Sequence, residues 1–488
     1  MKGKKNSIGV NVLHMFYSTA LSSVLNAIAL IVLANYLNSK DYGILSVALA
    51  FAMIMSYFTD SGLSEIVLRE GSKRNSNIEV ILSSYIKLRT ILLVATFGIG
   101  FIIIHLTTQS SELINIAYYL IIPMVLGVAM QSIGTTYFKL SEKMQYSGYI
   151  KMCSSSCLII IILIGILLNL NSLLIAFMYG FAYFLAGLFA FVLLLKEIKV
   201  SLSSPFHKEL FSQFWSFLLS GLLFVTLPQI GPLVLEKTLT LSEVGFFAVA
   251  YRIPQALTQL PLVIAAAFIP VLFRQFNSHQ VIKHRDLNIL QIKVMGIIGM
   301  GMAIPFYYMS DTIIGIILGE EWVMAATLLK VLCLMLVFQS MSIALADGLT
   351  SMGKQNNRTV VQAMALLCGI ILYFYLSNRI GIMGASYSGV LIEVIALGGF
   401  WLLNPHKWEI AKRALLPYML YFGSTILLLN YLLNSYPVIS VVIHFILLML
   451  LLLIDKELNS NLQEKLKRVK HVYKKKHVRT SKEVGSGL

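Results

Sequence analysis

An arginine lies deep inside a long apolar run near the middle of the chain. Residues 239–276 read LTLSEVGFFAVAYRIPQALTQLPLVIAAAFIPVLFRQF, and Arg252 lies ten residues into the helix predicted at 242–273. At a rise of 1.5 Å per residue this is roughly 15 Å from the helix end, near the middle of a hydrocarbon core about 30 Å thick. A guanidinium facing lipid at that depth is costly. We therefore expect Arg252 to face the protein interior or a wet cavity and to meet a partner or an anionic ligand.

Three prolines interrupt the same run: Pro254, Pro261 and Pro270. Each removes a backbone hydrogen bond from the helix. Membrane helices usually break where they line a cavity, because other groups there can satisfy the freed backbone atoms. The run therefore predicts a cavity beside Arg252.

Four carboxylates lie within or near the apolar runs, and a buried carboxylate can bind a proton or a sodium ion. Glu393 is the deepest and is a candidate for ion coupling; alternatively, it forms a structural ion pair with Arg252. Asp60 is a second candidate for coupling, and it could instead cap or turn a helix near the inner face. Glu65 and Asp347 lie close enough to the interface that we expect them to be solvated.

The composition is that of an integral membrane protein. Of 488 residues, 58% are hydrophobic and 12% are charged, with a mean hydropathy of +0.80; soluble domains carry about 25% charged residues. The four cysteines fall in apolar segments without ligand-like neighbours, so we predict neither a disulfide framework nor a metal site. No small-residue cleavage motif follows the first apolar run, which predicts an uncleaved first span.

The apolar runs predict an all-α polytopic membrane protein with about fourteen transmembrane helices, each near the ~20 residues needed to cross a bilayer. The predicted spans are 14–36, 42–67, 83–106, 114–137, 147–168, 173–195, 210–235, 242–273, 288–309, 323–350, 359–377, 382–403, 414–433 and 437–454.

Basic residues orient these spans. With the N-terminus inside, all but five of the 38 Lys and Arg residues fall on the inner side; the five are Lys40, Lys237 and Arg379 in outer loops and Arg252 and Lys330 within spans. This positive-inside bias predicts that both termini are cytoplasmic. The formal charge of +16 is therefore an orientation signal and does not indicate a nucleic-acid partner.

An internal repeat divides the chain. Residues 41–48 (DYGILSVA) match 243–250 (EVGFFAVA) at an offset of 202, and 176–180 match 385–389 at an offset of 209. Each half holds six spans, an even number, so the halves point the same way, as in parallel-repeat transporters. We predict two six-helix lobes around a central cavity that rock to give alternating access; a duplicated bundle without transport is the alternative.

The corresponding domains are residues 1–200 for the N-terminal lobe, 201–408 for the C-terminal lobe, 409–455 for spans thirteen and fourteen, and 456–488 for a basic cytoplasmic tail. The tail is partly amphipathic, and attraction to anionic lipid headgroups is sufficient to explain its charge.

Several motifs carry a resemblance to a known family. They are ANYLNSKDYG at 34–43, DSGL at 60–63, EVG at 243–245, AYR at 250–252, Pro270, GEEW at 319–322 and the Gly353-Lys354 turn. Together they resemble the bacterial polysaccharide and O-antigen flippases (Wzx type) of the multidrug/oligosaccharidyl-lipid/polysaccharide (MOP) exporter superfamily, which also contains the MATE exporters. The likeness covers roughly residues 10–405. A chain with fourteen spans also resembles the peptidoglycan-lipid flippase, whereas drug-exporting members usually have twelve.

The resemblance implies translocation of an undecaprenyl-pyrophosphate-linked oligosaccharide from the inner to the outer leaflet of a bacterial cytoplasmic membrane. It also implies a cationic cavity and coupling to a proton or sodium gradient, with no other cofactor. By analogy, spans thirteen and fourteen could shape a groove for the polyprenyl tail. Expected partners are this lipid-linked oligosaccharide, membrane lipids and, as a further possibility, polysaccharide assembly proteins.

A pyrophosphate–sugar headgroup needs positive charge at cavity depth, and a planar guanidinium can bind two phosphate oxygens. Arg252 is therefore the first candidate for substrate contact. Arg69 and Lys139 could collect headgroups from the inner leaflet, or they could be positive-inside anchors. Lys330 lies nearer the outer side, where it could help release or could extend to the interface.

Two uncharged residues complete the candidate substrate site. Asn26 could hydrogen-bond across the cavity or between neighbouring helices. Tyr251 could stack on a sugar ring or pack against its neighbours.

Other classes of protein remain as alternatives. A MATE-like small-molecule exporter should have fewer cations in its cavity and has no need of spans thirteen and fourteen; a peptidoglycan lipid II flippase is the other alternative. A membrane enzyme needs an acid/base constellation at one face, usually on a sizeable loop. The loops hold no paired carboxylates, metal-ligand spacing or nucleotide-binding motif. We therefore predict a secondary transporter that is not an enzyme.

Overall fold

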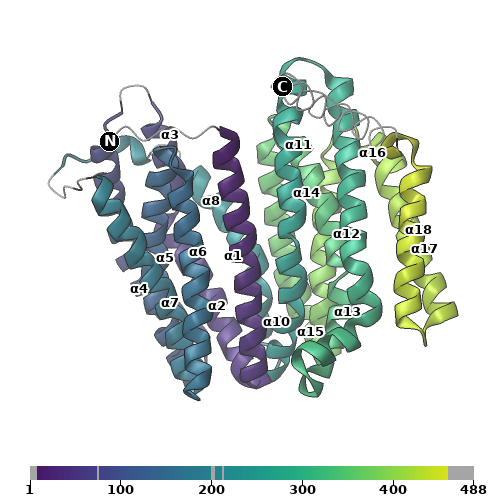
Figure 1. Ribbon diagram of the computed structural model, residues 1–488, viewed down its shortest axis with the longest axis horizontal. Coiled ribbons are helices and arrows are strands. Elements are labelled where there is room, and N and C mark those ends of the chain that lie inside the picture. The colour runs from purple at the N-terminus through teal and green to yellow at the C-terminus, as the bar shows by residue number, and fades with distance from the viewer. Residues whose placement is uncertain (1–7, 74–75, 199, 201–203, 212–213, 460–488) are drawn as a thin grey trace, which may run out of the picture.

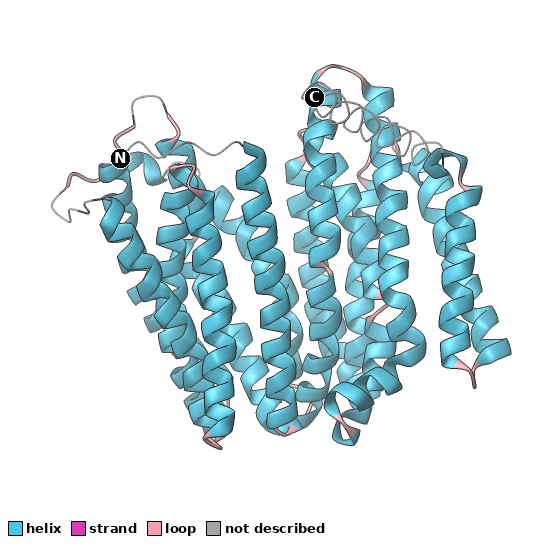
Figure 2. Cartoon of the chain, viewed as in Figure 1, coloured by secondary structure: helices cyan, strands magenta, loops and turns pink. Residues whose placement is uncertain are grey.

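The computed structural model describes residues 8–73, 76–198, 200, 204–211 and 214–459, and every regular element within them is a helix. The helices stand side by side (Figure 1), and short loops join them at two opposite faces (Figure 2). The predicted all-α fold is confirmed. The predicted tail from residue 460 onward lies outside the described residues, as do residues 199 and 201–203 at the predicted lobe boundary.

The N-terminal lobe contains six spans, one of which is broken. Ser61 and Gly62 both have positive φ, of 49° and 79°, and form a left-handed turn between α2 and α3. The elements are α1 (Ile8–Tyr36), α2 (Ser39–Asp60), α3 (Leu63–Gly71), α4 (Ile78–Thr107), α5 (Ser111–Leu140), α6 (Met144–Leu167) and α7 (Ser172–Glu197).

The C-terminal lobe has more breaks in its helices. The predicted span 242–273 is divided at Thr258 into α10 and α11, with Pro254 inside the first part. The elements are the 3-10 turn η1 (Lys208–Phe211), α8 (Phe214–Thr226), η2 (Leu227–Gln229), α9 (Ile230–Leu235), α10 (Leu241–Leu257), α11 (Gln259–Asn277), α12 (Val281–Leu318), η3 (Glu320–Trp322), α13 (Val323–Leu332), α14 (Met335–Ser351) and α15 (Gln355–Leu402).

Helix α15 is 48 residues long and folds back on itself as a hairpin. Its backbone leaves helical geometry at Ile380 and Gly381, where the φ of Gly381 is 62°, a left-handed value that glycine adopts without a Cβ clash. A Cβ on Gly399 would lie 2.8 Å from a methyl group of Val361, so residues near opposite ends of α15 are neighbours. The two limbs therefore correspond to the two predicted spans 359–377 and 382–403.

This hairpin accounts for part of the difference between the fourteen spans predicted from the sequence and the twelve long apolar segments among the described residues of the structure. Within the described residues, twelve segments are long and apolar enough to cross a membrane, and α15 counts once among them. A shorter apolar segment, Gly221–Leu235, lies within the predicted span 210–235. With the second limb of α15 and this segment, the described chain contains about fourteen crossings, as predicted.

The two lobes meet where the internal repeat places equivalent residues. A Cβ on Gly43 of α2 would lie 1.9 Å from the carbonyl oxygen of Leu241, and a Cβ on Gly245 of α10 would lie 1.9 Å from the carbonyl oxygen of Ser39. Because Gly43 and Gly245, like Ser39 and Leu241, are 202 residues apart, the contact is reciprocal, as a two-fold relation requires. Only glycine permits so close an approach of the two backbones.

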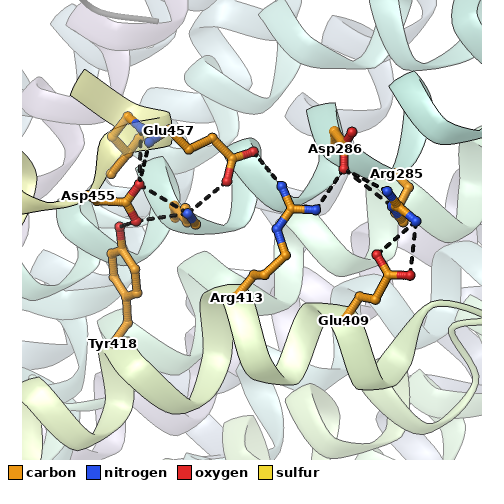
Figure 3. A network of polar contacts seen from close by, with 9 residues as sticks. Arg285, Asp286, Glu409, Arg413, Tyr418, Asp455 and Glu457 are labelled. Atoms are coloured by element: carbon orange, nitrogen blue, oxygen red, sulfur yellow. Dashed lines mark hydrogen bonds and ion pairs between the residues drawn. The ribbon is translucent and has the colours of Figure 1, made fainter. Parts of the chain in front are cut away.

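Helices α17 (Leu416–Leu433) and α18 (Pro437–Ile454) lie at the edge of the C-terminal lobe beside α12 (Figure 1). They follow the short helix α16 (Lys407–Ile410) and the π-helical turn η4 (Ala411–Leu415). A polar network at one end ties them to α12 (Figure 3).

Charged groups of α12, α16, η4 and the residues that follow α18 make up this network. Lys293 of α12 is buried and lies 2.8 Å from carboxylate oxygens of both Asp455 and Glu457, which follow α18. Arg413 of η4 lies 2.8 Å from Asp286 of α12 and 3.0 Å from Glu457. Burial raises the pKa of Asp455, but hydrogen bonds from Lys293 and from the Leu458 backbone amide outweigh it and hold that pKa below its usual value. The network therefore fixes the two C-terminal spans to the C-terminal lobe.

Candidate functional site

A cavity of about 430 Å³ lies between the two lobes, and we call it the central cavity. Both lobes contribute polar side chains to it: Asn26, Tyr42, Tyr179 and Tyr183 from the first, and Gln229, Arg252, Gln255 and Gln259 from the second. Arg252 therefore lies in the wall of a cavity between the two halves, and we predicted that it would face the interior or a cavity.

Arg252 meets a neutral partner. Its Nη1 donates a hydrogen bond to Oε1 of Gln255 at 3.0 Å, one turn further along α10. Within the described residues, no carboxylate lies at ion-pair distance from its guanidinium. The hydrogen-bonding capacity that remains on this group is available to an anion in the central cavity.

Asn26 of α1 also lines the central cavity. Its Oδ1 is buried, and no group of the described chain donates a hydrogen bond to it. A buried amide oxygen without a partner is costly. A hydroxyl or amide of a bound molecule could supply the missing donor.

A second cavity, of about 300 Å³, lies within the C-terminal lobe, and we call it the C-lobe cavity. Its polar lining comes from α10, α11, α14 and α15: Tyr251, Gln255, Thr258, Gln259, Gln339, Ser342, Arg358, Gln362 and Glu393. Glu393 is 8% exposed and accepts a hydrogen bond from Nε2 of Gln339 at 3.1 Å.

The alternative of an Arg252–Glu393 ion pair is wrong. No such pair exists among the described side chains, because Arg252 faces the central cavity and Glu393 the C-lobe cavity. Tyr251, the residue before Arg252, lines the C-lobe cavity and not the central cavity. Its ring stacks on Phe247 at a centroid distance of 5.6 Å.

Gln255 and Gln259 line both cavities. They lie on either side of Thr258, the residue at which α10 gives way to α11. Sequence reasoning did not single them out. Their signal was present as two amides four residues apart within an otherwise apolar run.

Asp60 lies elsewhere, in a polar cluster inside the N-terminal lobe. Its Oδ1 is 2.5 Å from Nη1 of Arg89, which is 2% exposed, and accepts a hydrogen bond from the Tyr85 hydroxyl at 2.6 Å. Its Oδ2 accepts hydrogen bonds from the hydroxyl and backbone amide of Ser64, in the first turn of α3. The carboxylate therefore caps a helix, one of the two roles considered for it, and pairs with a buried cation.

The remaining candidates lie near helix ends. Arg69, in the last turn of α3, is 3.2 Å from Glu70, and Lys139 lies in the last turn of α5. Neither lines the central cavity or the C-lobe cavity. The expectation that Asp347 is solvated is wrong: it is 5% exposed and accepts a hydrogen bond from Nε2 of Gln291 at 2.8 Å, because α14 packs this face against α12.

Several solved structures share this arrangement of helices. A structure of the lipid II flippase MurJ in an inward closed conformation is 15% identical; the alignment covers 89% of this chain and 97% of that one, with a TM-score of 0.66. An inward-facing multidrug resistance transporter of the MATE family is 14% identical; the alignment covers 80% of this chain and 96% of that one, with a TM-score of 0.68. A MOP superfamily transporter from Pyrococcus furiosus is 14% identical; the alignment covers 82% of this chain and 94% of that one, with a TM-score of 0.55. At these identities the likeness shows the fold alone.

The helices define a multi-pass membrane protein, and their arrangement is the fold of the MOP-type transporters. A family model described as polysaccharide biosynthesis protein matches residues 8–276, more than half of the chain. The chain belongs to this family of polysaccharide biosynthesis proteins, and the predicted resemblance is confirmed. A comparison with curated proteins found no match.

Proposed function

We propose that this protein translocates an undecaprenyl-pyrophosphate-linked oligosaccharide across the cytoplasmic membrane of a bacterium. The headgroup occupies the central cavity during transfer from the inner to the outer leaflet. Membership of a polysaccharide biosynthesis family supports the substrate class, and likeness to a lipid II flippase supports the handling of a lipid-linked glycan.

The arginine in the central cavity carries this proposal. The Arg252 guanidinium lies on α10 beside a neutral glutamine, and no carboxylate of the described residues is at ion-pair distance from it. A pyrophosphate can take that place through two parallel hydrogen bonds to the guanidinium. A cavity for a cationic drug would instead gain from a free carboxylate, and none of the described residues that line the central cavity is Asp or Glu.

The rest of the central cavity suits sugar hydroxyls. Asn26, Gln229 and Gln259 present amides, which can both donate and accept hydrogen bonds. Tyr179 and Tyr183 stack on each other with ring centroids 5.8 Å apart and add apolar faces with polar hydroxyls. Neutral groups of this kind can hold a glycan without fixing it to one repeat unit.

The C-lobe cavity is proposed as the coupling site for a proton or sodium ion. Oε1 of Gln339 and Oγ of Ser342 are buried without hydrogen-bond partners in the described chain, and both residues line this cavity with Glu393. Glu393 and these two neutral oxygens form a ligand set that a hard cation accepts, and the same carboxylate can bind a proton. Arg358 adds one positive charge to the lining of this cavity.

Transport in this scheme requires the lobes to separate and close again. The contact between Gly43 and Gly245 joins α2 and α10 near their first turns, which the orientation of the basic residues places at the outer face. Opening the central cavity to the inner leaflet would leave this contact in place, and opening it to the outer leaflet would require the contact to part.

A flipping assay in proteoliposomes tests the proposal. Fluorescent polyprenyl-pyrophosphate glycans are placed in both leaflets, and a membrane-impermeant reagent reports how fast the protected pool becomes accessible. The proposal predicts redistribution well above that of protein-free vesicles. Lipid II and a cationic dye serve as comparison substrates. Movement of the dye alone would favour the MATE-like exporter, and movement of lipid II alone would favour the peptidoglycan-lipid flippase.

A further inference from the structure

A groove on the C-terminal lobe, separate from both cavities, contains a lysine in an apolar setting. It encloses about 580 Å³, within the size range of ligand pockets, and lies between α12, α13 and the two limbs of α15. Apart from Lys330 and two tyrosines its lining is aliphatic: Tyr307, Lys330, Val331, Leu334, Tyr387 and Leu391 are among its residues.

Lys330 lies at membrane depth without an acidic partner. It comes seven residues after α13 begins at Val323, roughly 10 Å along the helix. Its Nζ lies 5.4 Å from the centroid of the Tyr307 ring, and no carboxylate of the described chain is at ion-pair distance. The face of an aromatic ring attracts an ammonium but leaves its charge in place. An unpaired cation at this depth is costly, so an anion from outside the chain would stabilise it.

The groove is held in shape by its surroundings. Asn430 of α17 donates a hydrogen bond to the Tyr307 hydroxyl at 2.7 Å, which fixes the ring beneath the lysine. The span containing Lys330 breaks after Leu332, and Leu334 at the break lines the groove. Irregular backbone within a membrane is tolerated where protein or a cavity surrounds it, so the break belongs with a binding groove.

We propose that this groove binds an anionic phospholipid from the leaflet that the positive-inside bias predicts to be the outer one. The lipid phosphate pairs with the Lys330 ammonium, and an acyl chain covers the aliphatic wall. A soluble anion fits less well because it would leave that wall uncovered, and the exposed side chains of Tyr387 and Leu391 continue the wall toward the surrounding lipid. The site is independent of the proposed transport function, since Lys330 lines neither the central cavity nor the C-lobe cavity.

Native mass spectrometry of the full chain tests this site. The protein is purified in detergent and mixed with phosphatidylglycerol or phosphatidylcholine of identical acyl chains, and retained lipid is counted. The wild-type protein should prefer phosphatidylglycerol, and Lys330→Gln should lower its retention about fivefold, the usual contribution of one basic residue to binding of anionic lipid. Lys330→Arg should keep the preference, because it keeps the charge.

Arg379→Gln is the matched control. Arg379 is also a cation predicted on the outer side, with its guanidinium carbon 5.7 Å from the Tyr375 ring centroid, but it does not line the groove. Leu391→Trp, which fills the groove, should reduce retention of both lipids. Equal retention of phosphatidylglycerol by the wild type and Lys330→Gln would overturn the proposal. Displacement of the lipid by excess glycerol phosphate would also overturn it, because the site would then bind a soluble anion.

Discussion

Arg252 and Glu393 lie in adjacent cavities and do not pair. Arg252 hydrogen-bonds to Gln255 at 3.0 Å in the central cavity, and Glu393 accepts a hydrogen bond from Gln339 at 3.1 Å in the C-lobe cavity. Gln255 lines both cavities and stands three residues before the break between α10 and α11. Under the proposed function, an anion bound in one cavity and a cation bound in the other would therefore act on the same broken helix. Any coupling between them is reciprocal.

Replacing Arg252 tests the substrate site. Arg252→Ala should slow flipping of the polyprenyl-pyrophosphate glycan about 10- to 100-fold, because hydrogen bonds to a charged group contribute about 1.5–3 kcal/mol. Arg252→Lys should be intermediate, since it keeps the charge and loses the planar fork. Proteoliposome flipping rates, with protein content matched, give the measurement. Arg379→Ala is the control, and a wild-type rate in Arg252→Ala would remove this arginine from the site.

Replacing Glu393 tests ion coupling. Glu393→Gln keeps the size of the side chain and its ability to accept a hydrogen bond from Gln339, but it can neither release a proton nor carry a charge. We expect flipping in the variant to lose its response to an imposed proton or sodium gradient while a basal rate persists. Rates measured with and without each gradient decide this. Glu65→Gln, at an exposed position on α3, should respond as the wild type does. An unchanged response in Glu393→Gln would place the coupling site elsewhere.

The Asp60–Arg89 pair predicts a stability effect. Asp60→Asn leaves the buried Arg89 without its counter-charge, and breaking a buried pair in this way typically costs about 3–5 kcal/mol. The double variant Asp60→Asn with Arg89→Met should recover much of the loss, because it removes the stranded charge as well. Thermal unfolding in detergent measures both variants. If Asp60→Asn is as stable as the wild type yet loses its response to a gradient, Asp60 takes part in coupling instead.

The network between α12 and the C-terminal spans predicts that the stability of the folded protein depends on pH. The pKa of Asp455 is lower in the folded protein than its usual value of about 3.9. Its contribution to stability is therefore complete above about pH 4 and is lost as the pH falls through the lowered value. Thermal unfolding of Asp455→Asn should show a lower midpoint than the wild type at pH 7, and the difference should shrink near pH 3.

Asp311→Asn is the control for this experiment, because Asp311 is an exposed residue of α12 outside the network. Its unfolding midpoint should follow that of the wild type at both pH values. A constant difference between Asp455→Asn and the wild type from pH 7 to pH 3 would contradict the assignment of the pH effect to this carboxylate.

Local properties of the sequence determined the broad architecture. Hydropathy is a sum over about twenty consecutive residues, so the spans could be located without knowing their neighbours. The bend at Ile380 and Gly381 agrees with two predicted spans that meet in a short loop. The offset of 202 residues likewise anticipated the reciprocal contact of Gly43 and Gly245, because equivalent positions in a two-fold arrangement meet at its axis.

Which side chains meet across helices was decided only by the tertiary structure. Depth along a helix can be counted from the sequence, and Arg252 does lie within a helical segment, Leu241–Asn277, that is long and apolar enough to span a membrane. The direction in which a side chain points depends on the rotation of its helix and on the helices packed beside it. That rotation separates Arg252 from Glu393, brings Asp60 to Arg89 across 29 positions of sequence, and buries Asp347 against Gln291.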